Sequence, residues 1–128
     1  MNITNRKLVE NITLMRQISQ KQLPVKVSYT LSRNISHIDS AISLYDKERK
    51  KLLDKYAKKD EKGKFVLRSD GRSVEFTSIT AAKAFQKDLN TLLDIKADID
   101  IRKIKLSDFG EVSFSAAELT AIDYMIED

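Results

Sequence analysis

Residues 24–58 read PVKVSYTLSRNISHIDSAISLYDKERKKLLDKYAK, and this stretch decides the fold. Its apolar residues recur at alternating spacings of four and three, the period of one face of an α-helix. This series, the apolar seam, consists of Leu31, Ile35, Ile38, Ile42, Tyr45, Leu52 and Tyr56, and is broken only by Arg49. The pattern predicts one helix of about 35 residues, roughly 50 Å long. Pro24 fits its first turn, where the missing N–H costs nothing.

Two more helices are expected next to this long helix in the sequence, one before it and one after it. Residues 4–21 predict a first helix that Thr4 can cap. Because the connection between them is short, the first helix should fold back on the long helix as a helical hairpin. A third helix should start at Ser78 or Thr80 and cover the lower half of the apolar seam. The inward residues are Leu8, Ile12, Met15 and Ile18 in the first helix, and Ala82, Phe85, Leu89 and Leu92 in the third.

A β-hairpin is expected after the long helix, which should end near residues 60–63. Asp70 and Gly71 are typical of a two-residue type I′ turn, in which both residues have positive φ. With these two residues as the loop, the cross-strand pairs are Ser69 with Arg72, Leu67 with Val74, and Phe65 with Phe76. The four large apolar residues then share one covered face, so turn chemistry and side-chain alternation agree on the register.

The last third of the chain predicts short strands and a final helix. Apolar and charged residues alternate over 97–101, the period of a half-buried strand, and Ile104 and Leu106 extend it after a bulge. Val112 and Phe114 predict another short strand. The final helix opens with a capping box of Ser115 and Glu118, and has Leu119, Ile122 and either Met125 or Ile126 facing inward.

Length and composition suit one domain over residues 1–128. We expect an α+β fold: a long helical hairpin with a small antiparallel β-hairpin or sheet and two further helices. The chain has no cysteine, which is compatible with a reducing compartment. No apolar run approaches the roughly 20 residues of a membrane helix, and no signal-peptide core follows the first residues. These features are compatible with a location in the cytoplasm.

Charge is distributed unevenly along the chain. Residues 45–64 hold nine basic and five acidic side chains, a balance of +4 that equals the formal net charge of the whole chain. The last 23 residues hold six acids and no base. The basic segment is interpreted either as a solvated helix face with paired charges or as a weak nucleic-acid binding surface.

The residues that most often carry chemistry form no recognisable site. His37 is the single histidine and lies outside the seam positions, so it should face solvent. Asp94, Asp98 and Asp100 lack the glycine and closing glutamate of a calcium loop. No serine has a histidine or lysine placed by sequence to activate it. We therefore expect no enzyme activity, no cofactor and no metal site.

A partner-binding surface is expected where the long helix outruns its covering elements. A third helix of about 15 residues spans roughly 22 Å, less than half of the long helix. The part left for a partner carries Tyr45, Arg49, Leu52 and Tyr56, and tyrosine and arginine often anchor interfaces. Two interpretations of Arg49 stay open: its stem lies on the core with the head group in water, or it marks where the seam becomes available for binding.

The chain resembles small uncharacterised proteins of phages and prophages of Gram-positive bacteria. The likeness lies in the opening residues 3–8, the entry to the long helix at 23–26, the segments 59–63 and 104–108, and the ending 117–127. The resemblance implies a phage origin and expression inside a bacterium, and it implies no catalytic residue.

These observations predict a non-enzymatic phage accessory protein that binds a host or phage protein as an inhibitor or adaptor. The alternative is a structural or assembly protein of the virion that self-associates through the long helix. A third possibility is weak nucleic-acid binding through residues 45–64. No membrane association is expected.

Overall fold

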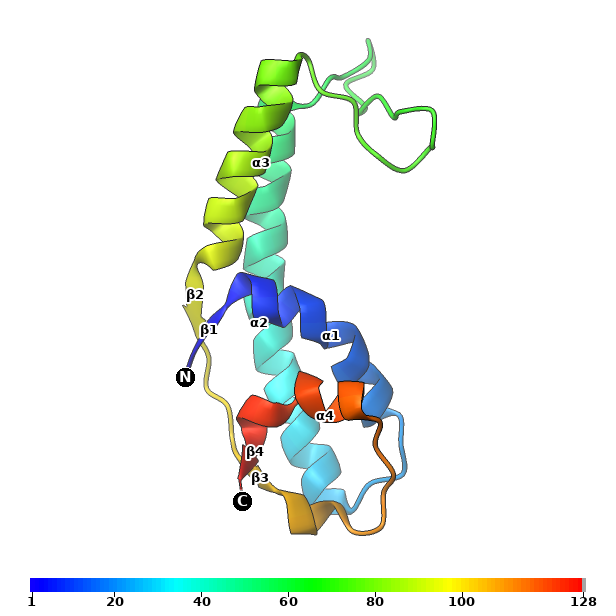
Figure 1. The fold of residues 1–128 in the computed structure, drawn as a ribbon, viewed down its shortest axis with the longest axis vertical. Coiled ribbons are helices and arrows are strands. Elements are labelled where there is room, and N and C mark those ends of the chain that lie inside the picture. The colour runs from blue at the N-terminus through cyan, green and yellow to red at the C-terminus, as the bar shows by residue number, and fades with distance from the viewer. Residues whose placement is uncertain (128) are drawn as a thin grey trace. The chain divides into compact units, whose positions relative to one another are not determined.

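A computed structural model describes residues 1–127 of the chain and shows an α+β fold (Figure 1). The expected fold class, with a long helix and a small antiparallel sheet, is confirmed. The helices are α1 (Asn5–Ser19), α2 (Val25–Tyr56), α3 (Ile79–Asp94) and α4 (Ala116–Ala121), with short 3-10 helices η1 (Leu106–Phe109) and η2 (Asp123–Met125). The strands are β1 (Asn2–Thr4), β2 (Lys96–Asp98), β3 (Ile104–Lys105) and β4 (Ile126–Glu127).

The chain divides into two compact units, and α2 contributes to both. The terminal unit comprises residues 1–43 and 96–127, and the central unit comprises Leu44–Ile95. Each unit has a hydrophobic core of its own. Whether the chain behaves as the single domain expected from its length stays a prediction.

The core of the terminal unit joins α1 to the first part of α2. Thr4 caps α1 as expected, because its Oγ accepts a hydrogen bond from Lys7 N at 3.2 Å. The apolar face predicted for the first helix is buried together with the first part of the apolar seam. This shared cluster includes Leu8, Ile12, Met15, Ile18, Leu31, Ile35 and Ile38.

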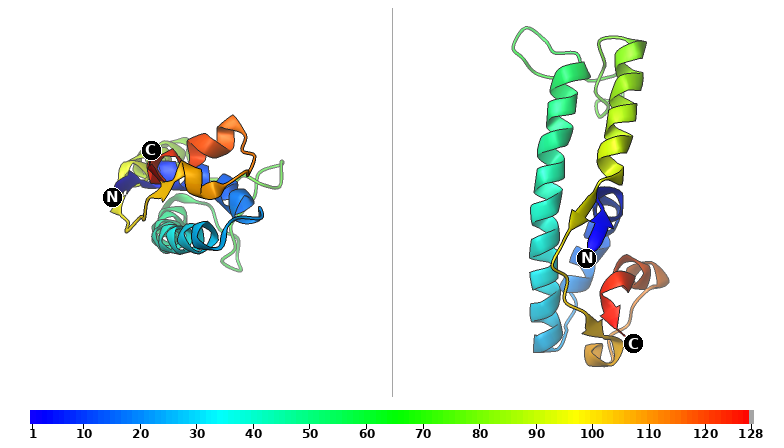
Figure 2. Two further views of the ribbon diagram at one scale, coloured as in Figure 1. Left: turned by 90° about the horizontal axis from the view of Figure 1, so that it is seen from below. Right: turned by 90° about the vertical axis from the view of Figure 1, so that its left-hand side faces the viewer.

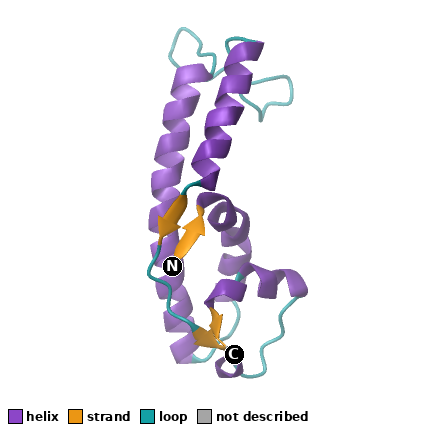
Figure 3. Cartoon of the chain, turned by 60° about the vertical axis from the view of Figure 1, so that its left-hand side comes forward, coloured by secondary structure: helices purple, strands orange, loops and turns teal. Residues whose placement is uncertain are grey.

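Two small sheets complete the terminal unit. β1 pairs antiparallel with β2, with Ile3 opposite Ala97, and β3 pairs parallel with β4, with Ile104 opposite Ile126 (Figure 3). Strands β1 and β4 were not predicted, because strands of two or three residues are too short to show a period. The strand expected over 97–101 ends at residue 98, although the buried and exposed residues alternate as predicted.

The C-terminal segment bears out one prediction and contradicts two. The capping box is present: Glu118 N donates to Ser115 Oγ at 3.1 Å, and Ser115 N donates to Glu118 Oε1 at 2.9 Å. The strand predicted at residues 112–114 does not form, and the Phe114 ring instead meets the Phe109 ring edge-on at 5.1 Å. Leu119 is exposed rather than inward. Helix α4 has only six residues and buries its other side.

The core of the central unit lies between the end of α2 and α3, which run antiparallel side by side (Figure 2). Ser78 caps α3, since its Oγ accepts from Ala81 N at 3.0 Å. The predicted covering of the lower seam by the third helix is confirmed. The cluster contains Leu52, Leu53, Tyr56 and Ala57 with Phe85 and Leu89.

The hairpin has the predicted register but a different turn. Leu67 pairs with Val74, as expected. The predicted type I′ turn was wrong. That turn needs positive φ at both Asp70 and Gly71, but only Gly71 has a positive φ, at 71°. Gly71 N instead donates to Arg68 O at 2.9 Å, so the turn covers residues 68–71.

The pairing of Phe65 with Phe76 was also wrong. Helix α2 ends at Tyr56, earlier than expected, and residues 57–59 then run between the two hairpin arms. Ala57 pairs with Phe76 and Lys59 pairs with Phe65, because residues 57–59 satisfy backbone groups of both arms. The covered face consequently lacks Leu67, whose side chain is 51% exposed.

Candidate partner-binding surface of the central unit

The four predicted site residues differ in how far they reach solvent. Tyr45 is buried, Leu52 and Tyr56 are half-buried, and Arg49 is exposed. Leu52 and Tyr56 pack against the core of the central unit. Arg49 is therefore the member of the set whose side chain is exposed.

Tyr56 links α2 to α3. Its hydroxyl donates a hydrogen bond to Asp88 Oδ2 at 2.8 Å, and Lys55 Nζ lies 5.0 Å from the centre of its ring. These contacts agree with a core tyrosine that keeps its hydroxyl at a polar edge. Tyr56 therefore helps to hold α2 and α3 together.

Arg49 lines a hollow of about 370 Å³ on the central unit, which we call the arginine hollow. Its lining includes the arginines Arg49, Arg68 and Arg72 and the apolar side chains of Leu53, Phe76 and Phe85. Arg68 and Arg72 were not predicted as site residues. Both flank the Asp70-Gly71 turn, but no local pattern in the sequence places that turn beside Arg49.

The arginine hollow lies in the unit that carries the net charge of the chain. Residues 44–95 hold 13 basic and 9 acidic side chains, which gives +4, so the rest of the 128-residue chain is neutral on balance. Some of these charges are paired at the surface, as in Lys51 with Glu48 at 2.9 Å and Lys59 with Asp54 at 3.0 Å. Within residues 1–127, no carboxylate lines the arginine hollow.

Asp70 fixes the loop that carries two of the three arginines. Its Oδ1 accepts hydrogen bonds from Arg72 N and Ser73 N, both at 2.9 Å, and its Oδ2 accepts from Ser73 Oγ at 2.8 Å. The two backbone donors, then the Ser73 hydroxyl, lower the pKa of Asp70 from 3.8 to about 2. The carboxylate therefore holds the loop backbone, while the Arg68 and Arg72 side chains remain exposed.

The prediction that His37 faces solvent was wrong, because its side chain makes a polar contact in the terminal unit. His37 is half-buried, and its Nδ1 lies 2.8 Å from Asp100 O, so Nδ1 carries the proton in this contact. Arg33 pairs with Asp100 at 2.8 Å, and its hydrogen bond and charge lower the pKa of that carboxyl. Since both side chains bind residue 100, His37 has a structural role here.

The three aspartates considered for metal binding are not brought together. Asp98 lies 3.3 Å from the amino group of Met1, and Asp100 is engaged by Arg33. In the part of the chain that the structure describes, no three histidine, cysteine or acidic side chains are grouped to hold a metal ion.

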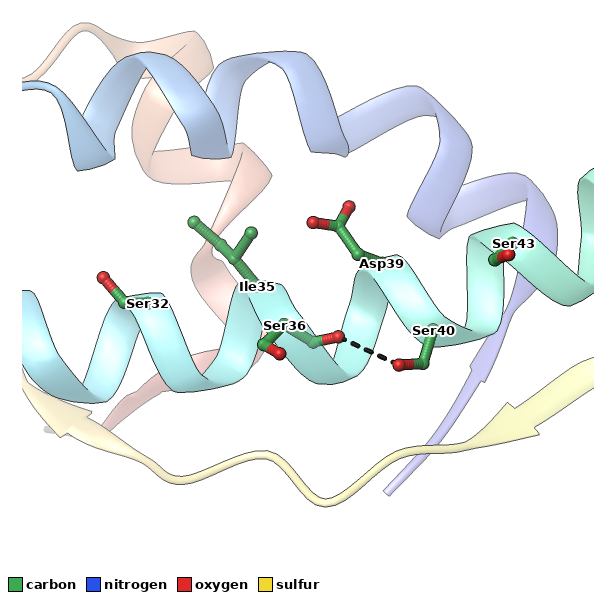
Figure 4. A pocket seen from close by; sticks show the side chains of 6 residues that line it. All are labelled: Ser32, Ile35, Ser36, Asp39, Ser40 and Ser43. Atoms are coloured by element: carbon green, nitrogen blue, oxygen red, sulfur yellow. Dashed lines mark hydrogen bonds between the residues drawn. The ribbon is translucent and has the colours of Figure 1, made fainter.

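A separate serine-rich hollow, of about 570 Å³, lies along α2 in the terminal unit (Figure 4). Exposed hydroxyl side chains dominate it, and Ser40 Oγ donates to Ser36 O at 3.2 Å. Its one acid, Asp39, is paired with Arg16 of α1 at 2.6 Å. This surface offers hydroxyl groups and little charge.

None of the helices within residues 1–127 is both long enough and apolar enough to cross a membrane. Comparison with known proteins found no matching family model, no similar curated protein and no similar solved structure.

Proposed function

We propose that the protein is a non-enzymatic accessory protein of a phage or prophage that binds a host or phage protein through the central unit. Inhibitor and adaptor are the two roles that such binding serves. The observation that carries the proposal is Arg49, an exposed arginine at the wall of a hollow with an apolar lining. Arginine beside buried aromatic and aliphatic groups is typical of interface anchors.

The charge distribution supports the same surface. The whole formal excess of +4 lies in residues 44–95, so an acidic partner is attracted to this unit rather than to the terminal unit. The resemblance to phage proteins agrees with a small chain that acts by binding.

The proposal is tested by comparing Arg49→Glu with Lys50→Glu. Both variants reverse one exposed charge on the same helix, but Lys50 does not line the arginine hollow. Tagged parent and variants are expressed in a Gram-positive host, and a protein captured in stoichiometric amount is purified and titrated against each. We expect Arg49→Glu to weaken binding at least about tenfold and Lys50→Glu to weaken it much less.

Melting curves provide the control for folding. An exposed head group contributes little to stability, so both variants should melt close to the parent. Loss of stability with unchanged binding in Arg49→Glu would assign Arg49 to the fold and move the binding surface elsewhere.

A second candidate function is self-association through α2, as in a virion assembly protein. It is favoured by an uncharged exposed ridge on the first part of the helix, formed by Val25, Tyr29, Ser32, Ser36 and Ser40. Small hydroxyl residues allow two helices to approach closely. Light scattering of the parent and of Ser36→Arg tests it, and a monomeric parent at high concentration contradicts it.

A further inference from the structure

The arginine hollow brings together three positive side chains from two elements. Arg49 comes from α2, and Arg68 and Arg72 come from the two sides of the hairpin turn. All three are exposed, and the described residues place no ion pair on any of them. Three positive side chains around one hollow attract an anion, although the Asp70 carboxylate already interacts with Arg68.

Arginine and its surroundings define the kind of anion. Guanidinium groups bind carboxylate or phosphate through paired N–H donors. Apolar side chains of Leu53, Phe76 and Phe85 also line the hollow, which favours a ligand that carries both a negative group and an apolar part. Phe85 is buried and its ring lies 5.0 Å from the Phe76 ring, so Phe85 offers no free face for stacking bases.

A neighbouring hollow extends this surface. It has a volume of about 520 Å³ and shares Arg68 and Phe76 with the arginine hollow. Ile79, at the start of α3, also lines it and is 78% exposed. Lys83 and Glu75 are its other charged residues and have opposite signs, so this second hollow is neutral on balance apart from the shared Arg68.

We propose that the two hollows together bind an acidic peptide segment of the partner protein, with a carboxylate among the three arginines and a neighbouring large apolar side chain in the second hollow. A compact anion would fill only the first hollow, whereas an extended segment fills both. This inference rests on the proposed function and names the chemistry of its partner.

The experiment titrates the full-length chain with fluorescent synthetic peptides and follows anisotropy. Each peptide has two glutamates beside a leucine or phenylalanine, and matched peptides have glutamine in place of glutamate or serine in place of the apolar residue. We expect both replacements to weaken binding, and the loss of the acids to weaken it at least about tenfold. Equal binding of the acidic and glutamine peptides overturns the proposal.

Variants of the protein test the assigned residues. Arg68→Gln and Arg72→Gln remove one positive charge each from the arginine hollow, and Lys62→Gln removes one exposed charge elsewhere in the central unit. We expect a loss of about tenfold for each arginine variant and less than about twofold for Lys62→Gln. Unchanged affinity in both arginine variants, with unchanged melting curves, overturns the site.

Two further probes separate the sources of the anion. Inorganic phosphate and a single-stranded oligonucleotide are titrated alongside the peptides. If either binds through Arg68 and Arg72 while no acidic peptide does, the peptide proposal is overturned.

If Arg49→Glu loses a captured partner and the peptides still fail to bind, this inference fails and the proposed function stands. If peptides bind as expected and the captured partner is indifferent to Arg49, the hollow stands and the proposed function fails.

Discussion

Asn34 is a fully buried polar residue, and its hydrogen bonds fix a distant backbone segment. Its Nδ2 donates to Arg102 O at 2.9 Å, and its Oδ1 accepts from Arg102 N at 3.0 Å. One amide side chain thus satisfies both backbone groups of a residue that belongs to no strand. This contact and those of Arg33 and His37 to Asp100 hold residues 100–102 against α2 without strand pairing.

Replacing Asn34 with alanine should destabilise the fold by about 1–3 kcal/mol, because it removes two hydrogen bonds to the partly buried backbone of Arg102. Urea denaturation followed by circular dichroism measures the change. Ser36→Ala is the matched control, since Ser36 is exposed on the same helix and its replacement should cost less than about 0.5 kcal/mol. Equal losses in the two variants would mean that the Arg102 backbone finds other partners.

Asp70 gives the hairpin loop a defined response to acid. Its pKa is about 2 when folded and 3.8 ordinarily, so the folded state holds the ionised form more strongly than the unfolded state. The stabilisation is therefore fully present above pH 4 and is lost as the pH falls from about 4 toward 2. Hydrogen exchange of the Arg72 and Ser73 amides should accelerate relative to other loop amides over that range. Asp70→Asn should exchange fast at all pH values, and a parent loop that does not change with acid contradicts this assignment.

The hairpin is the element in which turn geometry can be tested most directly. Gly71 has φ of 71°, and no other atom lies within 4 Å of an added side-chain carbon. Gly71→Val should consequently lose stability through backbone strain alone, by about 1–3 kcal/mol. Gly71→Asn is the control, because asparagine tolerates positive φ better. Equal urea midpoints for the valine variant and the parent would show that the loop adopts another turn at no cost.

Helices were predictable from the sequence because each carries several turns of a regular pattern. The seam identified α2, and the caps Thr4, Ser78 and Ser115 marked where three other helices begin. Helix ends were less predictable: α2 stops at Tyr56, since the next residues gain backbone partners in the hairpin. Such long-range pairing has no local signal.

The residues of the candidate site also differ in whether the sequence predicts them. Arg49 was predictable as the polar interruption of an apolar series. Arg68 and Arg72 were not, because their meeting with Arg49 depends on how the hairpin arms pair with residues 57–59. The burial of Tyr45 could not be predicted either, because a periodic pattern identifies one face of a helix but not the residues that cover it.

At the scale of the whole molecule, the uneven charge sets the limits of binding to nucleic acid. The basic side chains of residues 45–64 are interleaved with five acids, and two of them, Lys51 and Lys59, are paired with acids of this segment. Interleaved acids repel phosphate, so the surface lacks the continuous positive stripe of strong nucleic-acid binders. Specific binding to an acidic protein segment and weak binding to nucleic acid can therefore be told apart by their salt dependence.

Binding of the full chain to labelled duplex DNA should be weak, independent of sequence and steeply reduced by salt, because it would come from counterion release by the lysines between residues 47 and 64. Anisotropy titrations at low salt and at about 0.15 M salt, with two unrelated duplexes, measure this. Removing Lys62 and Lys64 together should reduce the salt slope, whereas Arg68→Gln should affect the acidic peptide more than the DNA. An affinity that differs between the duplexes and persists at physiological salt would make nucleic-acid binding the leading function. The arginine hollow would then have to be reinterpreted as part of a phosphate-binding surface.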